Sequence, residues 1–449
     1  MRKDIPSLFC RYALPQMLGL LFNSVYFIVD GVFIGNRLGR DAMAAAGVAV
    51  PMLEFMIALS MAVTAGSGVI VSLSLAQKNT RSANACAMHA LYTTLIFGTV
   101  LAAAGHVLLQ PLCAFLGSTP AIETYVESYL SIILTLSPFM LLSFLLGGLV
   151  RNDGRPVHAM IALTVGSLSN IVLDWLFMYP LNMGISGAAL ATGLGPILSD
   201  LILLPHFLLK RGDLRLCAVL PQPRLFGRIL LLGIPSFVME FTIGMITYIT
   251  NLSINRLGFG EIGLAAYLLI GYLILIILTL FLGMAEGLQP VFSFMKGKDD
   301  REGLHGMRRF AAAVFAAIGL FCYVFVFFCS GAFYSLFTAG DQALLAFTSQ
   351  HSAAYFSGFV FAGINILMIS FWQSVEETGK SMLTALLRSV LLPPFFILLL
   401  PILCGPDCFW FGHSISEAVT AVIVFFLLRH PSSPRRPAPG PESADACFS

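Results

Sequence analysis

Six carboxyl side chains lie inside long apolar runs of this sequence, where a charge is costly. They are Asp30, Glu54, Asp174, Asp200, Glu240 and Glu286. In membrane hydrocarbon a charged side chain costs roughly 2.5–3.5 kcal/mol on insertion scales, so each acid is a candidate functional group. No Lys or Arg is expected deep inside a run, and an interior with carboxylates alone would repel anions and favour cations or protons.

Two of these acids share one depth with two neutral polar side chains. Asp30 and Asp174 each lie six residues before the outer end of an apolar run, and Thr192 lies six residues after the start of its own run. At 1.5 Å per residue, each is about 9 Å below the outer surface. Asn170 is four residues before Asp174, on the same helical face. Because two nearby carboxylates cannot readily both be ionised away from water, this group is suited to hold a proton or a hard cation such as Na⁺.

The other acids have no such partners. Glu240 follows Pro235 by five residues, while Glu286 and Glu54 lie in the eighth and second runs. We assign these three acids to the second half of the molecule or to a central cavity. Structural roles at helix ends or in hydrogen bonds fit Glu54, Asp200 and Glu286 equally well. No pattern predicts a structural metal site.

The elements that position these residues are predicted to be membrane-spanning helices. The 449 residues are 58% apolar and 11% charged, with a mean hydropathy of +0.88, which excludes a soluble enzyme. A net charge of +2 without a long basic run excludes a disordered or nucleic-acid-binding chain. A bilayer core of about 30 Å needs about 20 apolar residues per helix, and the alternation typical of a barrel is absent. Twelve runs are long enough: 12–36, 48–76, 85–110, 123–150, 157–180, 186–208, 226–255, 262–294, 309–332, 346–374, 382–404 and 408–429.

The distribution of Lys and Arg predicts the orientation. With the N-terminus in the cytoplasm, 22 of these residues fall on the inner side and 3 on the outer side, so both termini are expected inside. Cys404 and Cys408 flank a Gly-Pro-Asp turn on the outer side, where free thiols are favoured over a disulfide. The segment 431–449 holds five prolines and is expected to be disordered.

An internal repeat predicts two related bundles. Asn36-Arg37-Leu38-Gly39 closes the first run, and Asn255-Arg256-Leu257-Gly258 closes the seventh, an offset near 220 that other pairs share. Six spans per half give both halves the same orientation, related by a pseudo-two-fold axis along the membrane normal. The expected domains are an N-terminal six-helix bundle over 1–210, a cytoplasmic linker over 211–225, a C-terminal bundle over 226–430 and the tail over 431–449. A channel remains an alternative, although no filter motif is visible.

Three segments together resemble the multidrug and toxic compound extrusion (MATE) family, and the resemblance covers nearly the whole chain. They are LPQMLGLLFNSVYFIVDGVFIGNRLG, NIVLDWLFMYPLNMGISGAALAT and GLQPVFSFMKGKDD. The resemblance implies twelve helices in two lobes and a coupling-cation site in the first lobe at Asp30, Asn170, Asp174 and Thr192. It is nearest to the bacterial drug-exporter branch and implies a multi-pass protein of the cytoplasmic (inner) membrane. Some branches use a glutamate in the seventh span, but its spacing varies among them, so the resemblance implies little about Glu240.

The leading hypothesis is a secondary antiporter that exports lipophilic, cationic organic compounds in exchange for H⁺ or Na⁺ by alternating access. The alternative is a flippase for a lipid-linked saccharide, whose polyanionic headgroup would want Arg or Lys in the cavity. A membrane-embedded transferase would need an acid–base or metal cluster, and a haem subunit would need paired histidines; neither is visible. We therefore expect no enzyme activity, no cofactor, no nucleic-acid partner and a monomer in the lipid bilayer.

Overall fold

A computed structural model describes residues 5–429 except 39, 117, 119, 121, 216, 218 and 336–341. The whole of the predicted tail over 431–449 and the first four residues lie outside this range. The described part is helical and contains no strand. Cys404 and Cys408 are free thiols.

Two consecutive sets of helices make up the chain. The first half contains α1 (Ile5–Leu38), α2 (Arg40–Ala76), α3 (Thr80–Val107), α4 (Leu109–Phe115), α5 (Glu123–Asn152), α6 (Pro156–Met178) and α7 (Ile185–Leu208). The second half contains α8 (Pro223–Arg256), α9 (Gly260–Gly297), α10 (Arg301–Ser335), α11 (Gln342–Phe356), α12 (Phe359–Ser374), α13 (Thr378–Ala385), a π-helical turn (Leu386–Leu391), α14 (Leu392–Cys404), a 3₁₀ turn (Pro406–Phe411) and α15 (Gly412–Arg429).

The predicted all-helical membrane fold is confirmed. Within the described residues, 11 helices are long and apolar enough to cross a membrane, or up to 12 spans if α11 and α12 count as one span with a 45° bend. The span over Thr378–Cys404 is also irregular, because Pro393 and Pro394 lack the N–H groups of a regular helix. The π-helical turn directly before them accommodates this loss.

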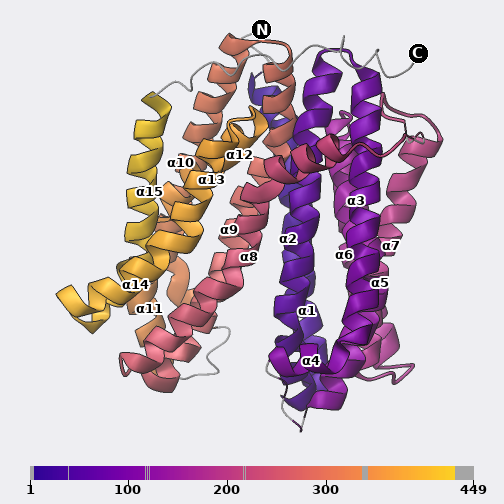
Figure 1. Cartoon of the computed structure of the whole chain (residues 1–449). Helices are drawn as coiled ribbons and strands as arrows, with labels where there is room; N and C mark the ends of the chain where they lie inside the picture. The colour runs from indigo at the N-terminus through magenta and orange to yellow at the C-terminus, as the bar shows by residue number, and fades with distance from the viewer. Residues whose placement is uncertain are drawn as a thin grey trace.

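The two halves lie side by side, and the start of α1 and the end of α15 lie at the same end of the molecule (Figure 1). We call this the terminal end. The closest contacts between the halves are reciprocal: α1 packs on α9, and α2 packs on α8. Because α8 and α9 are the repeats of α1 and α2, this is the pairing that a two-fold axis between the halves produces.

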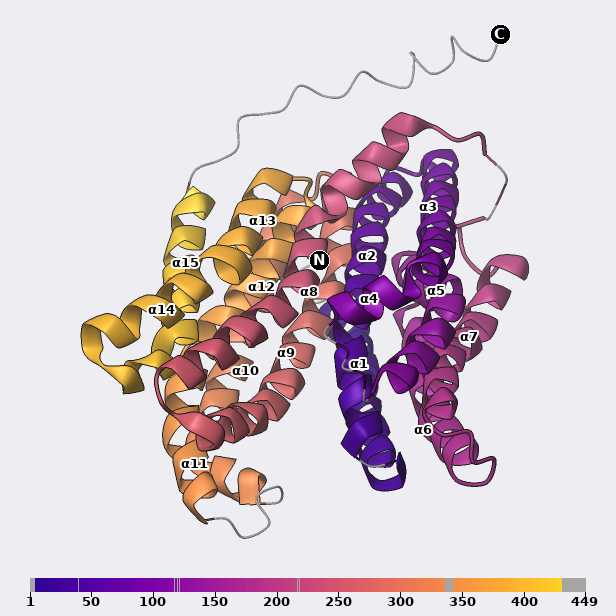
Figure 2. The same cartoon turned by 60° about the horizontal axis from the view of Figure 1, so that its bottom comes forward.

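The halves meet backbone to backbone toward the terminal end. A Cβ atom on Gly66 of α2 would lie 1.9 Å from the carbonyl oxygen of Ile229 on α8. A Cβ atom on Gly233 of α8 would lie 1.8 Å from the carbonyl oxygen of Ala62 on α2. Only glycine permits this approach. Toward the opposite end the ribbons of the two halves diverge (Figures 1 and 2).

The segment between α7 and α8 is bound to the first half. Asp153 accepts hydrogen bonds from the backbone N–H groups of Asp213 and Leu214, at 2.9 and 3.3 Å to Oδ1. Farther along, His89 of α3 accepts a 2.8 Å hydrogen bond from the backbone N–H of Gln222. The predicted linker is thus anchored along much of its length rather than loose.

Helix α10 has apolar side chains both on the face that packs in the protein and on the exposed face. One face is buried at helical spacing through Leu304, Met307, Ala311 and Phe315. The other face also exposes large apolar side chains, and Phe328 is 77% exposed. A helix that is apolar all round is expected where lipid replaces water.

Candidate cation site and cavities

Asp30 and Asp174 meet where α1 packs on α6. Asp30 is 8% exposed and Asp174 is fully buried, and their carboxyl groups are within hydrogen-bonding contact of each other. Neither oxygen of Asp174, nor Oδ1 of Asp30, has a hydrogen-bond donor among the described residues. Two buried carboxyl groups in contact cannot both stay charged unless a proton or a cation lies between them.

Asn170 and Thr192 complete the four predicted residues of the cation site. Asn170 lies one helical turn before Asp174 on α6, and both polar atoms of its amide are buried without a hydrogen-bond partner in the described structure. Thr192 on α7 is buried and lies against the hydroxyl group of Tyr129 on α5. The structure therefore brings together four side chains from three helices, α1, α6 and α7, that sequence spacing had assigned to one depth.

Two tyrosines belong to the surroundings of this cluster, and sequence analysis missed both as site residues. Tyr26 and Tyr129 are each within electrostatic reach of Asp30 and Asp174. Tyr26 lies four residues before Asp30, so the helical period alone points to a shared face. Tyr129 has no such signal, because nothing in the sequence links α5 to α1.

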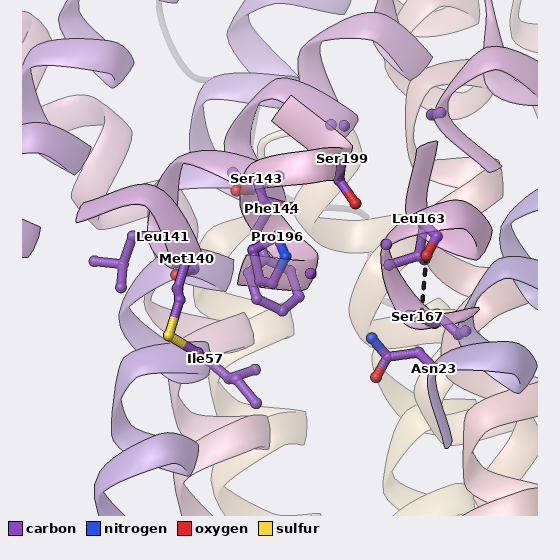
Figure 3. Close-up of a pocket in the computed structure, with 18 of the residues that line it drawn as sticks. Asn23, Ile57, Met140, Leu141, Ser143, Phe144, Leu163, Ser167, Pro196 and Ser199 are labelled. Carbon is purple, nitrogen blue, oxygen red and sulfur yellow. Dashed lines mark hydrogen bonds between the residues drawn. The ribbon is translucent and has the colours of Figure 1, made fainter. Parts of the chain in front are cut away.

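A cavity that is partly open to solvent adjoins the cluster, and its empty space is about 1100 Å³ with the open solvent included. Asn170 and Thr192 line its wall, whereas Asp30 and Asp174 are not lining residues and lie behind them. Figure 3 shows apolar side chains such as Met140 and Phe144 on one side of the cavity and the polar Asn23 on the other. The space suits a largely apolar molecule with a few polar groups.

At one end of this cavity an ion pair joins the two halves. Glu286 of α9 accepts a 2.8 Å hydrogen bond at Oε2 from the side-chain amide of Gln16 on α1. A guanidinium nitrogen of Arg151 on α5 lies 3.6 Å from the same oxygen. A second cavity of about 510 Å³ continues beyond this pair and is also lined by Glu240 and Gln373.

The expectation that no basic side chain lies deep in a span is wrong at Arg388, and a second arginine is buried in the last turn of a span. Arg151 is buried inside α5, and Arg388 is buried in the π-helical turn, where its Nε lies 2.9 Å from Oε1 of the fully buried Glu417. Asn365 also donates a 2.8 Å hydrogen bond to Glu417. Sequence analysis counted both arginines among the Lys and Arg residues of the inner side, and it missed Glu417 among the intramembrane acids.

The remaining predicted acids have different surroundings. Glu240 lines the second cavity within electrostatic reach of Glu286 and Glu54. Glu54 is half-buried and is not among the residues that line either cavity. Asp200 on α7 is buried, and neither of its oxygens has a hydrogen-bond partner in the described structure.

Comparisons with known proteins agree on one family. The family model MatE matches residues 15–176 and 235–398, one stretch in each half. The multidrug export protein MepA of Staphylococcus aureus (strain bovine RF122 / ET3-1) is 23% identical over 429 residues, with 93% of each chain covered. MepA of Staphylococcus saprophyticus is 22% identical over 425 residues, again with 93% of each covered.

Solved structures share the fold at similar identity. A crystal structure of MATE in complex with MaL6 matches with a TM-score of 0.89 and 23% identity, covering 94% of this chain and 95% of the other. An outward-facing multidrug resistance MATE family transporter of the MOP superfamily matches with a TM-score of 0.89 and 22% identity, covering 94% of each chain. A MOP superfamily transporter from Pyrococcus furiosus, described with a binding pocket of reverse polarity, matches with a TM-score of 0.88 and 22% identity, covering 94% of each chain.

Proposed function

Because this chain belongs to the MATE family of multidrug transporters, we propose that it exports lipophilic organic cations in exchange for H⁺ or Na⁺. It is a membrane transporter and not an enzyme. The observation that carries the exchange is the buried contact between Asp30 and Asp174 directly behind a cavity wall. Asn170 and Thr192 belong to both the cluster and the wall, so an ion and a substrate would share these two side chains.

The coupling has a simple energetic basis. One charge that moves through 100 mV is worth about 2.3 kcal/mol, equivalent to a substrate gradient of roughly fifty-fold. To use this energy, the carboxyl pair must take up an ion on one side and release it on the other. A proton between the two carboxyl groups satisfies this requirement, and so does Na⁺ held by carboxylate, amide and hydroxyl oxygens.

Alternating access between two rigid halves, 1–210 and 226–430 joined by 211–225, is the conformational mechanism that we propose. The close glycine contacts at the terminal end support a closed gate there. The charge distribution predicts that this end faces the cytoplasm, so this conformation would be outward-facing. We place the protein, as a monomer, in a bacterial inner membrane, with both termini in the cytoplasm.

The cavities favour cationic over polyanionic substrates. Arg151 is the single basic side chain among the residues that line them, and Glu286 already balances its charge. Glu240 adds a further carboxyl group. A lipid-linked saccharide with a pyrophosphate would meet no free cation among these lining residues, so the flippase alternative is the weaker hypothesis.

Uptake into inverted membrane vesicles, whose cytoplasmic side faces the medium, tests the coupling. A fluorescent organic cation is offered while a pH gradient and a Na⁺ gradient are imposed separately, and one of the two should drive transport. Asp174→Asn and Asp30→Asn should each abolish gradient-driven transport and leave expression nearly intact, because a neutral amide costs less to bury than a charge. Full transport by both variants, together with loss of transport in Glu286→Gln, would move the coupling site to the second half.

A further inference from the structure

The ion pair between Arg151 and Glu286 differs from an ordinary buried salt bridge. Arg151 is 5% exposed, yet its Nε has no hydrogen-bond partner in the described structure, and its nearest contact with Glu286 is 3.6 Å. That distance allows strong electrostatic attraction without a hydrogen bond. The guanidinium group is therefore held mainly by charge, and another cation at Glu286 would compete with it directly.

Glu286 is the reachable member of the pair. Its side chain is 20% exposed, and both residues line both cavities, so the pair stands at the junction of the two spaces. The surrounding wall is largely apolar, with Met61 common to both cavities. A lipophilic cation that reached the bottom of the larger cavity would find Glu286 as its nearest counter-charge.

The pair also stands across the seam between the halves. Glu286 lies on α9 of the second half, and Arg151 lies on α5 of the first half. One turn farther along α9, Gln289 donates a 2.9 Å hydrogen bond to the backbone carbonyl of Ala65 on α2. Arg151 and Glu286 therefore have to move apart if the halves separate at the terminal end.

From these contacts we propose that Arg151 is a tethered counter-ion for Glu286. While the halves are closed at the terminal end, Arg151 is paired with Glu286 and lowers the affinity of the cavity for organic cations. When that end opens, Arg151 leaves with the first half, and an organic cation takes its place at Glu286. The inference rests on the proposed export function and adds the group that makes affinity differ between the two conformations.

Such a difference is what an exporter requires, since it must bind on one side and release on the other. A carboxylate that stayed free in both conformations would retain its cation at the release side. A buried charge without a counter-charge is strongly unfavourable, so the exchange between the tethered and the diffusing cation keeps Glu286 compensated throughout.

Binding of tetraphenylphosphonium to the purified full-length protein tests this role through a double-mutant cycle. Arg151→Gln removes the competitor and should tighten binding by about tenfold, while Glu286→Gln should weaken it by about tenfold. The double variant should bind like Glu286→Gln, because Arg151 acts only through that carboxylate. Arg151→Lys keeps the charge and should retain wild-type affinity. In vesicles, Arg151→Gln should transport more slowly although it binds more tightly.

A matched control is the exposed ion pair of Arg228 and Glu376, which lies outside both cavities. Glu376→Gln should leave tetraphenylphosphonium affinity unchanged. Unchanged or weaker binding by a folded Arg151→Gln protein would overturn the proposal. If Arg151→Gln does not fold, the affinities of Arg151→Lys and Glu286→Gln decide the question. If tetraphenylphosphonium bound neither the wild-type protein nor Arg151→Gln, the cationic substrate class would be rejected as well. Asp174→Asn tests the coupling ion separately, since it does not touch this pair.

Discussion

Thr192 is the one uncharged hydroxyl in the predicted cation site, and its contribution can be separated from that of the acids. Removing a single hydrogen bond or ligand costs about 0.5–1.5 kcal/mol, whereas removing a carboxylate removes the charge that binds the ion. Thr192→Ala should therefore weaken the apparent affinity for the coupling ion by about two- to tenfold without abolishing transport.

The measurement for Thr192→Ala is the ion concentration that gives half-maximal efflux. Thr93→Ala is the matched control, because Thr93 is also buried but bonds only to the carbonyl of His89 within its own helix. Complete loss of transport in Thr192→Ala would mean that the hydroxyl is indispensable. An unchanged ion affinity would remove Thr192 from the site.

Individual site residues could be predicted from the sequence where the pattern lay within a single helix. The spacing of Asn170 and Asp174 placed both on one face of α6, and depth alone grouped them with Asp30. Prediction from the sequence failed for Arg151, because a window of apolar residues cannot distinguish the last buried turn of a helix from the first residue of a loop. The partner that makes Arg151 tolerable, Glu286, is distant in the chain, so only tertiary structure reveals the pair.

Helices α2 and α8 approach each other backbone to backbone toward the terminal end, where we propose that the gate is closed. Gly66→Ala would place a methyl group 1.9 Å from the backbone oxygen of Ile229, so the two helices must move apart. Overpacking of this kind typically costs about 1–3 kcal/mol, which would shift the conformational equilibrium away from the closed state by about 5- to 150-fold. We expect Gly66→Ala to open the terminal end and to reduce transport.

Spin labels at Thr80 and Arg301, which are exposed on the first turns of α3 and α10, report this opening as a longer interlabel distance. Gly271→Ala on α9 is the control, since no atom lies within 4 Å of the added Cβ. A wild-type distance together with full transport in Gly66→Ala would show that the close approach of α2 and α8 is not needed for gating.

Helix existence was predictable from the sequence, but helix shape was not. Long apolar runs predict the membrane spans, because crossing the bilayer takes about 20 apolar residues regardless of which helices pack beside them. The 45° bend between α11 and α12 and the π-helical turn before Pro393 depend on how neighbouring helices replace lost backbone bonds. The sequence shows the prolines but not the local geometry that accommodates them.

At the scale of the whole molecule, the distribution of Lys and Arg predicts the orientation in the membrane, with both termini in the cytoplasm. Cysteines replace Met183 and Asp213 one at a time, after the exposed native cysteines have been changed to serine. Both positions are exposed, and they lie in the connections at opposite ends of α7. Because Lys and Arg concentrate on the side that holds residue 213, Met183→Cys should react with an impermeant maleimide in intact cells and Asp213→Cys should not.

Gly212 would be a poor position for this labelling experiment, because a Cβ atom there would lie 1.8 Å from a carboxylate oxygen of Asp153. Permeabilised cells provide the positive control for Asp213→Cys. Labelling of Asp213→Cys in intact cells would reverse the orientation, and the direction of transport proposed above would reverse with it.

The anchoring of the connection between α7 and α8 limits how far the halves can separate. Backbone N–H groups at Asp213, Leu214 and Gln222 are held by side chains of the first half, so the connection travels with that half. The last of these anchored residues, Gln222, directly precedes α8, which begins at Pro223. A tether of this length would keep the second half at a very high effective concentration beside the first, so the opening proposed above would be a rotation about a fixed pivot rather than a dissociation.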